Sequence, residues 1–212
     1  MVIPCHNEAA TIGPVVAGAA AHGDVPVVDD RSSDDSRAVA EAAGAKVLAS
    51  EAPGYDGALT TGLKAAHARG YAFVVTMDAD GEHDPAVLGD FAEAFAAGAP
   101  LVCGVRPAPQ RAAEHLIAWA GRRRYGIADL LCGMKGYSRA VLDAFFASGA
   151  PLTVNMAPAA LWRLGDRPFA QAPVTGERRV GRPRFGRALA ANLALLKAYR
   201  SLGGLAPAGA RA

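Results

Sequence analysis

The most informative stretch of this sequence is FVVTMDAD, residues 73–80. A short apolar run rich in β-branched residues ends abruptly in two carboxylates, Asp78 and Asp80. This pattern predicts a buried parallel strand with both acids at its carboxyl end, where open α/β sheets bind ligands. Hard oxygen donors this close together suit Mg²⁺ or Mn²⁺ that also holds substrate phosphates. The plainer alternative is that Asp78 caps the following turn and Asp80 is solvated.

Strand-like and helix-like segments alternate on both sides of this stretch. Between the apolar runs lie segments with helix-start signals and helical spacing. This alternation predicts an α/β fold with a doubly wound, mostly parallel sheet. Further short apolar runs occur at residues 1–3, 26–28, 46–48 and 101–105.

The second half of the chain is less regular. We expect residues 129–137 to be irregular or hairpin-like, 169–174 to form an edge strand interrupted by Pro173, and 178–187 to form a basic loop. The spacing predicts a closing helix over 188–202 with one apolar stripe. That stripe either packs against the sheet or lies in a membrane interface, where Lys197 and Arg200 meet anionic headgroups. The stripe consists of Leu189, Leu193, Leu196, Tyr199 and Leu202.

Composition narrows the class of protein. With 212 residues, the chain is long enough for one domain with a substantial core, and its 51% hydrophobic residues are typical of a globular protein. A net charge of +2 does not indicate a general nucleic-acid binder. Three cysteines without metal-ligand spacing fit a reduced cytoplasmic protein without structural zinc. Neither a membrane span nor a signal peptide is expected, because no apolar run is long enough and no charged leader precedes one.

Polar groups follow three strands of the predicted sheet, and their order resembles a known family. The segments IPCHNE (3–8), VVDDRS (27–32) and MDADGEHDP (77–85) are similar to those of family-two glycosyltransferases with the GT-A fold. Two later segments, DLLCGMKGY (129–137) and GRPRFG (181–186) after Arg178, resemble the branch that glycosylates polyprenyl phosphates. The resemblance implies a metal-dependent inverting transfer of a sugar from a GDP- or UDP-sugar.

The same resemblance implies roles for individual residues. Donor binding falls to Pro4, His6, Glu8, Val28, Asp30 and Ala79, with Asp30 accepting a hydrogen bond from the base. Asp78, Asp80 and Glu82 are implied to hold the Mg²⁺ or Mn²⁺ ion, and Arg106, Arg178 and Arg184 to neutralise phosphate charge. Asp129 is the best candidate if a catalytic base is required. By contrast, Asp29 is expected to fix its turn, and Arg122–Arg124 is either a solvated helix face or a phosphate site.

The chemistry of the leaving group explains these residue types. Negative charge grows on the departing nucleoside diphosphate, and a metal ion with arginine forks stabilises that charge. A lipid-phosphate acceptor is already ionised near neutral pH and needs no strong base. Relatives that attack with sugar hydroxyls carry a Glu-Asp pair and a Gln-x-x-Arg-Trp segment, and neither is present here. This difference favours a polyprenyl-phosphate acceptor.

Three alternatives stay open at this stage: transfer to a soluble hydroxyl acceptor, nucleotidyl transfer, and non-catalytic binding of a nucleotide sugar. A nucleotidyltransferase normally has a glycine-rich loop where this chain has Pro-Cys-His-Asn-Glu. We expect one domain over 1–212, with a donor half at 1–105, an acceptor half at 106–187 and the closing helix with its tail at 188–212. The expected location is the cytoplasm, either free or peripheral on the inner face of the cell membrane.

Overall fold

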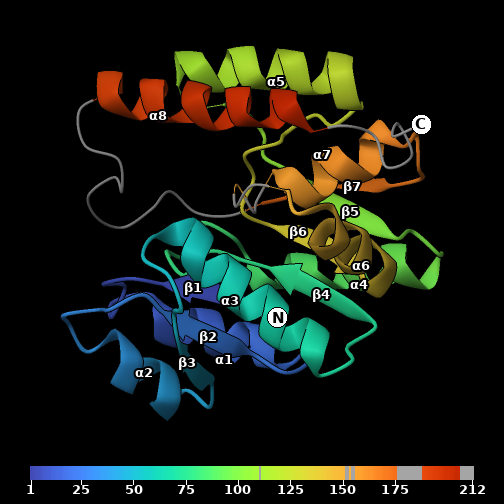
Figure 1. The fold of residues 1–212 in the computed structure, drawn as a ribbon. Coiled ribbons are helices and arrows are strands. Elements are labelled where there is room, and N and C mark those ends of the chain that lie inside the picture. Colours follow the sequence, from blue (N-terminus) through green and yellow to red (C-terminus); the bar gives the residue numbers. More distant parts are fainter. Residues whose placement is uncertain (110, 151–152, 154–155, 176–187, 206–212) are drawn as a thin grey trace.

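Two sheets joined edge to edge by a parallel bridge form the centre of the computed structural model, which describes residues 1–109, 111–150, 153, 156–175 and 188–205 (Figure 1). Strands β1 (Ile3–Cys5), β2 (Pro26–Asp29) and β3 (Lys46–Ala49) are parallel neighbours in that order. Strand β4 (Phe73–Thr76) joins β1 through a parallel bridge between Val2 and Thr76. The predicted doubly wound, mostly parallel sheet is thereby confirmed.

The far side of the sheet contains its one antiparallel member among the described strands. Beyond β4 lie β6 (Lys135–Ser138), β5 (Leu101–Val105) and β7 (Ala170–Pro173), and β6 runs antiparallel to both β4 and β5. The expectation of an irregular or hairpin-like segment at 134–137 was therefore wrong, whereas the edge strand near 169–174 is confirmed as β7. Gly136 suits its position because an added Cβ would lie 2.5 Å from the Phe95 ring.

Helices cover both faces of the sheet. Strand β2 shows why: Val27 and Val28 point to opposite faces and each lies in a separate hydrophobic cluster. Helices occupy the segments between the strands and follow the last strand, as the alternation in the sequence predicted. They are α1 (Ile12–Ala20), α2 (Ser36–Ala42), α3 (Tyr55–Ala68), η1 (Pro85–Val87), α4 (Leu88–Ala96), α5 (Ala112–Tyr125), α6 (Arg139–Ser148), α7 (Ala157–Leu164), α8 (Ala188–Ser201) and η2 (Leu202–Gly204).

The closing helix α8 packs beside α5, not on the sheet as one interpretation of its apolar stripe held (Figure 1). From that stripe, Leu196 and Tyr199 pack against the main core cluster and Leu202 is buried, but Leu193 is exposed. The basic loop expected at 178–187 lies outside the described residues. In the part of the chain that the structure describes, no helix has the length and apolar character to cross a membrane.

Candidate active site

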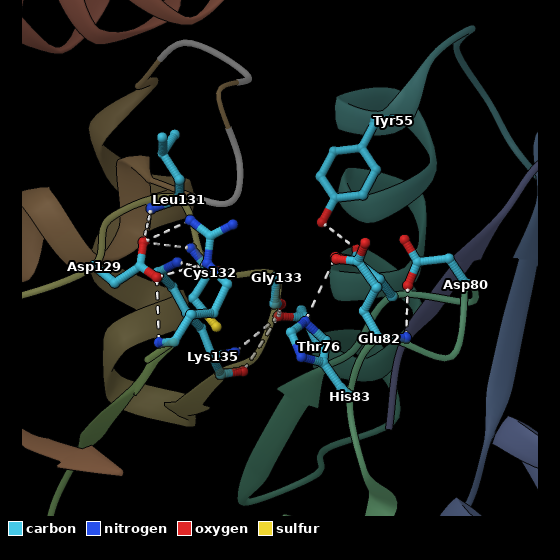
Figure 2. Close-up of polar contacts among 12 residues, drawn as sticks. Tyr55, Thr76, Asp80, Glu82, His83, Asp129, Leu131, Cys132, Gly133 and Lys135 are labelled. Carbon is cyan, nitrogen blue, oxygen red and sulfur yellow. Dashed lines mark hydrogen bonds and ion pairs between the residues drawn. The ribbon is translucent and has the colours of Figure 1, made fainter. Parts of the chain in front are cut away.

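Both acids after β4 are held in defined positions. Tyr55, in the first turn of α3, donates its hydroxyl to one carboxylate oxygen of Asp78 at 2.8 Å, and His83 Nε2 lies 3.7 Å from the other. The backbone N–H of Glu82 donates to Asp80 at 3.1 Å, and Asp80 is only 7% exposed. These contacts orient the two carboxylates (Figure 2).

The backbone between the two acids is fixed as well. Met77 is buried in the core, and the carbonyl oxygen of Ala79 accepts a hydrogen bond from the Thr11 hydroxyl at 2.8 Å. Thr11 stands at the N-cap position of α1 but makes no side-chain cap there. Its hydroxyl instead forms the bond that ties the start of α1 to the backbone between the two acids.

Gly133 brings the segment before β6 against Asp78. A Cβ at this position would lie 2.1 Å from Asp78 Oδ2, so a glycine is required for the observed approach. The hydroxyl of Thr76 donates to the Gly133 carbonyl oxygen at 2.8 Å and holds the two segments together. Figure 2 shows Gly133 and Thr76 between the acid cluster on one side and Asp129 with Lys135 on the other.

The carboxylate oxygens of Asp78 and Asp80 match part of the ligand set of a divalent cation. Carboxylate oxygens from Asp78 and Asp80 are the hard ligands that Mg²⁺ and Mn²⁺ prefer, and such ions usually take their other ligands from water and substrate phosphates. Among the described residues, no three His, Cys, Asp or Glu side chains are grouped so as to hold a metal ion by themselves. Glu82 as a third ligand therefore stays a prediction.

Asp30, at the end of β2, is engaged in local contacts. Its carboxylate accepts from Arg31 Nη1 at 2.6 Å and from the Gly54 backbone N–H at 2.7 Å. His6 Nδ1 lies 2.6 Å from the backbone carbonyl oxygen of Asp30, which places these two predicted donor-binding residues side by side. Asp29 accepts from the Ser32 N–H at 3.2 Å, which confirms that it fixes the turn.

Three other predicted donor-binding residues are buried in the protein. Pro4 and Val28 are register partners on adjacent strands, and both are buried. Glu8 is 7% exposed, and its backbone N–H donates to the Ser36 hydroxyl at 2.7 Å. Arg178 and Arg184 lie outside the described residues, and their roles stay predictions.

Arg106 and Asp129 bind each other. Arg106 Nε and Nη2 donate to the two oxygens of Asp129 at 2.7 and 3.0 Å, and the backbone N–H groups of Leu131 and Cys132 also donate to that carboxylate. Burial opposes ionisation of Asp129, but the hydrogen bonds and charge of Arg106 outweigh it and lower the pKa of this carboxyl. A carboxylate with a lowered pKa and these partners is a weak proton acceptor.

The same ion pair engages the guanidinium group of Arg106. A second carboxylate, Glu114 in the first turn of α5, lies 3.6 Å from Arg106 Nη2. Burial disfavours the charged guanidinium, yet the hydrogen bond and charge of Asp129 keep its pKa above the ordinary value. In this arrangement Arg106 holds residues 129–132 in place.

Lys135 completes the support of this segment. It is fully buried, and its ammonium group donates to the carbonyl oxygens of Leu130 at 2.9 Å and Cys132 at 2.5 Å. The segment 129–133 is thus fixed from one side by Arg106 and from the other by Lys135. Cys132 itself is no nucleophile, because burial raises the pKa of its thiol to about 11.

Tyr55 and Lys135 were missed by the sequence interpretation, and Gly133 was quoted without a role. A usable signal existed for Lys135, since a lone cation stands among the small and apolar residues 130–137. Tyr55 gave only a weak signal, because an aromatic residue between Gly54 and Gly57 is equally typical of a surface loop.

Comparison with known proteins agrees with this geometry. Residues 1–146 match the family described as Glycosyl transferase family 2. An uncharacterized glycosyltransferase of Mycobacterium tuberculosis is 32% identical over 190 residues, which cover 83% of this chain and 86% of that protein. The undecaprenyl-phosphate mannosyltransferase of Micrococcus luteus is 32% identical over 201 residues, which cover 82% of this chain and 81% of that protein.

A solved structure supports the fold. The glucosyl-3-phosphoglycerate synthase of Mycobacterium tuberculosis, crystallised with Mn²⁺, UDP-glucose and phosphoglyceric acid, superposes with a TM-score of 0.78 at 23% identity. The match covers 98% of this chain and 80% of the synthase chain, so the GT-A architecture extends over nearly all of the sequence. Together, the matched family and the full-length relatives show that this chain is a glycosyltransferase of family 2.

Proposed function

We propose that this enzyme transfers a sugar, with inversion, from a nucleotide sugar to a polyprenyl phosphate. The observation that carries the proposal is the Arg106–Asp129 ion pair, with its distances of 2.7 and 3.0 Å. Asp129 is the acid that the sequence offered as a base, and its lowered pKa makes it poorly suited to deprotonate a hydroxyl. A phosphate acceptor is already ionised and makes no such demand.

The acid pair supports the donor side of the proposal. Asp78 and Asp80 would hold a divalent cation, with Glu82 as the further candidate ligand. When bound, such an ion neutralises the charge that grows on the departing diphosphate. The protein contributes two carboxylates oriented by Tyr55 and by the Glu82 backbone, so little rearrangement is needed on binding.

The remaining assignments divide between the two halves of the chain. In the donor half, residues 1–105, His6 and Asp30 would contact the base, with Pro4, Glu8, Val28 and Ala79 lining the same region. In the acceptor half, residues 106–187, the segment 129–135 would stand beside the reacting groups, and Arg178 and Arg184 would neutralise phosphate.

Two relatives support the choice of substrates. The Micrococcus luteus protein is named for transfer to undecaprenyl phosphate and matches over most of both chains. The Mycobacterium tuberculosis synthase was crystallised with Mn²⁺ and UDP-glucose. A lipid-phosphate acceptor also implies that the enzyme works peripherally at the inner face of the cell membrane.

A transfer assay with two acceptors of equal chain length tests the proposal. Purified enzyme with Mg²⁺ or Mn²⁺ is given radiolabelled GDP-mannose or UDP-glucose and either a short-chain polyprenyl phosphate or the matching polyprenol, both in detergent. We expect label on the phosphate alone, and loss of transfer in Asp80→Asn. Equal transfer to the alcohol would refute the phosphate acceptor, and transfer unchanged in Asp80→Asn would refute the metal assignment.

A further inference from the structure

The outer surface of helices α5 and α8 exposes large apolar side chains. The two helices lie side by side at one end of the molecule (Figure 1). Leu116 and Trp119 on α5 are 53% and 61% exposed, and Leu193 on α8 is 62% exposed. Of the described residues, the other large hydrophobic side chain with comparable exposure is Phe73, far from this surface in the sequence. Exposed apolar side chains gathered on adjacent helices indicate a binding surface.

Cations follow the apolar residues on each helix. Spacings of three and four place Leu116, Trp119 and Arg123 on one face of α5, and Leu193, Lys197 and Arg200 on one face of α8. All three cations are exposed. The opposite faces are committed to the core, where Ile117 and Tyr125 are buried. We call the six outward residues the helix-pair surface.

Charge is strongly concentrated on these helices. Residues 112–125 and 188–201 contain five Lys and Arg residues and a single acid, Glu114. Glu114 is buried and bound by Arg111 at 2.9 Å, so it does not offset the cations outside. The two helices thus carry a net charge of +4, the difference between five cations and one acid, whereas the whole chain carries +2.

The helix-pair surface is linked to the active site. Glu114 in the first turn of α5 lies 3.6 Å from Arg106, which holds Asp129. Leu116 follows Glu114 by two residues, about 3 Å along the helix axis. Because residues two apart lie on nearly opposite sides of a helix, α5 stands between the helix-pair surface and the segment that we assign to the acceptor.

We propose that the helix-pair surface binds the headgroup region of an anionic bilayer. This inference deepens the proposed function and rests on its lipid-phosphate acceptor. Trp119, Leu116 and Leu193 would enter the interface, where Trp is favoured, and the cations would meet lipid phosphates. A second copy of the chain is a poorer partner, because a symmetric contact would bring the same cations face to face.

Tryptophan fluorescence locates the bound surface. The chain has two tryptophans, and Trp162 is only 8% exposed, so Trp119 is the natural reporter. With vesicles of phosphatidylcholine and phosphatidylglycerol that carry brominated acyl chains, we expect a blue shift and quenching of the wild type. Trp119→Phe should bind the vesicles with little quenching, because the remaining tryptophan is buried. Vesicles of phosphatidylcholine alone should bind weakly.

Charge variants test the electrostatic part. Replacing Arg123 and Arg200 by Gln should weaken binding by about 25-fold, or about fivefold for each charge removed near the surface. The matched control is Lys46→Gln with Arg69→Gln, two exposed cations elsewhere on the molecule, and it should bind as the wild type. Equal weakening in both pairs would show general attraction by net charge and overturn the assignment of the surface.

Other outcomes also overturn it. The first is an absence of vesicle binding, and the second is vesicle binding without quenching of Trp119. The third is a Trp119 signal that depends on protein concentration without vesicles, because this would indicate that a second copy of the chain covers the surface. Transfer to short-chain polyprenyl phosphate in detergent keeps the two proposals separate. If the wild type transfers there but ignores vesicles, the surface assignment fails and the proposed function stands. If it binds vesicles but shows no transfer to the phosphate, the proposed function fails instead.

Discussion

Gly133→Ala is the most direct test of how segment 129–133 meets the acid pair. The new Cβ would lie 2.1 Å from Asp78 Oδ2, whereas real Cβ contacts essentially never fall below 3.0 Å. Either the carboxylate or the segment must therefore move by at least 0.9 Å, the difference between these two distances. Tyr55 and Thr76 hold the two sides, so neither moves without loss of a hydrogen bond.

Displacement on this scale should affect catalysis more than folding. Overpacking costs about 1–3 kcal/mol of the free energy of unfolding, which lowers the melting temperature by roughly 2–4 °C for each kcal/mol in a chain of this size. Misplacement of a positioning group by about 1 Å is expected to reduce kcat/KM for sugar transfer by about 100-fold. Turnover is measured over a range of Mn²⁺ concentrations beside thermal unfolding.

Gly136→Ala is the matched control, only three residues away. Its Cβ would lie 2.5 Å from the Phe95 ring, in the core and away from the acids. It should lose stability like Gly133→Ala but keep most of its transfer rate per folded molecule. Near wild-type transfer in Gly133→Ala, or equal loss in both variants, would refute the role assigned to this approach.

Two more variants probe the same site. Tyr55→Phe removes the 2.8 Å hydrogen bond to Asp78 and should weaken Mn²⁺ affinity by about tenfold with little change in stability; unchanged affinity in a titration would show that Tyr55 does not orient the ligand. Asp129→Asn should make the free energy of unfolding less dependent on pH in the acid range. In the wild type, the lowered pKa of Asp129 stabilises the fold above the unfolded pKa of about 4, and that stability is lost as pH falls through the folded pKa. Urea unfolding across that range measures it, and parallel curves for variant and wild type would contradict the ion-pair assignment.

Local sequence patterns were sufficient to predict the structure where a residue's environment is set by its neighbours in the chain. The run from Phe73 to Asp80 predicted strand β4 and the acids at its end, and Val74 and Thr76 are buried as expected, whereas Phe73 is 45% exposed. Strand β6 shows the limit. Gly136 and Lys135 have weak strand preference, and they form a strand because β4 and β5 offer hydrogen bonds on both sides.

Long-range pairing explains the other differences. Nothing near Asp129 in the sequence indicates that Arg106, 23 residues earlier, binds its carboxylate. Likewise, the apolar stripe of α8 indicates that one face is covered, but not that α5 covers it. The ion pair and the helix packing both depend on which distant segments the fold brings together. The spacing of apolar residues within one helix contains no such information.

The support of the acid pair has a mechanistic consequence. Asp78 is held by Tyr55 of α3, and Gly133 lies so close that an added Cβ would be 2.1 Å from the Asp78 carboxylate. Segment 129–133 is in turn fixed by Arg106 and Lys135. Any ligand that changes the position of Asp78 must therefore work against the packing of segment 129–133. Because coupling between two binding sites is reciprocal, a donor that moves Asp78 and an acceptor that contacts segment 129–133 should change each other's affinity by the same factor, with Gly133 as the point of contact.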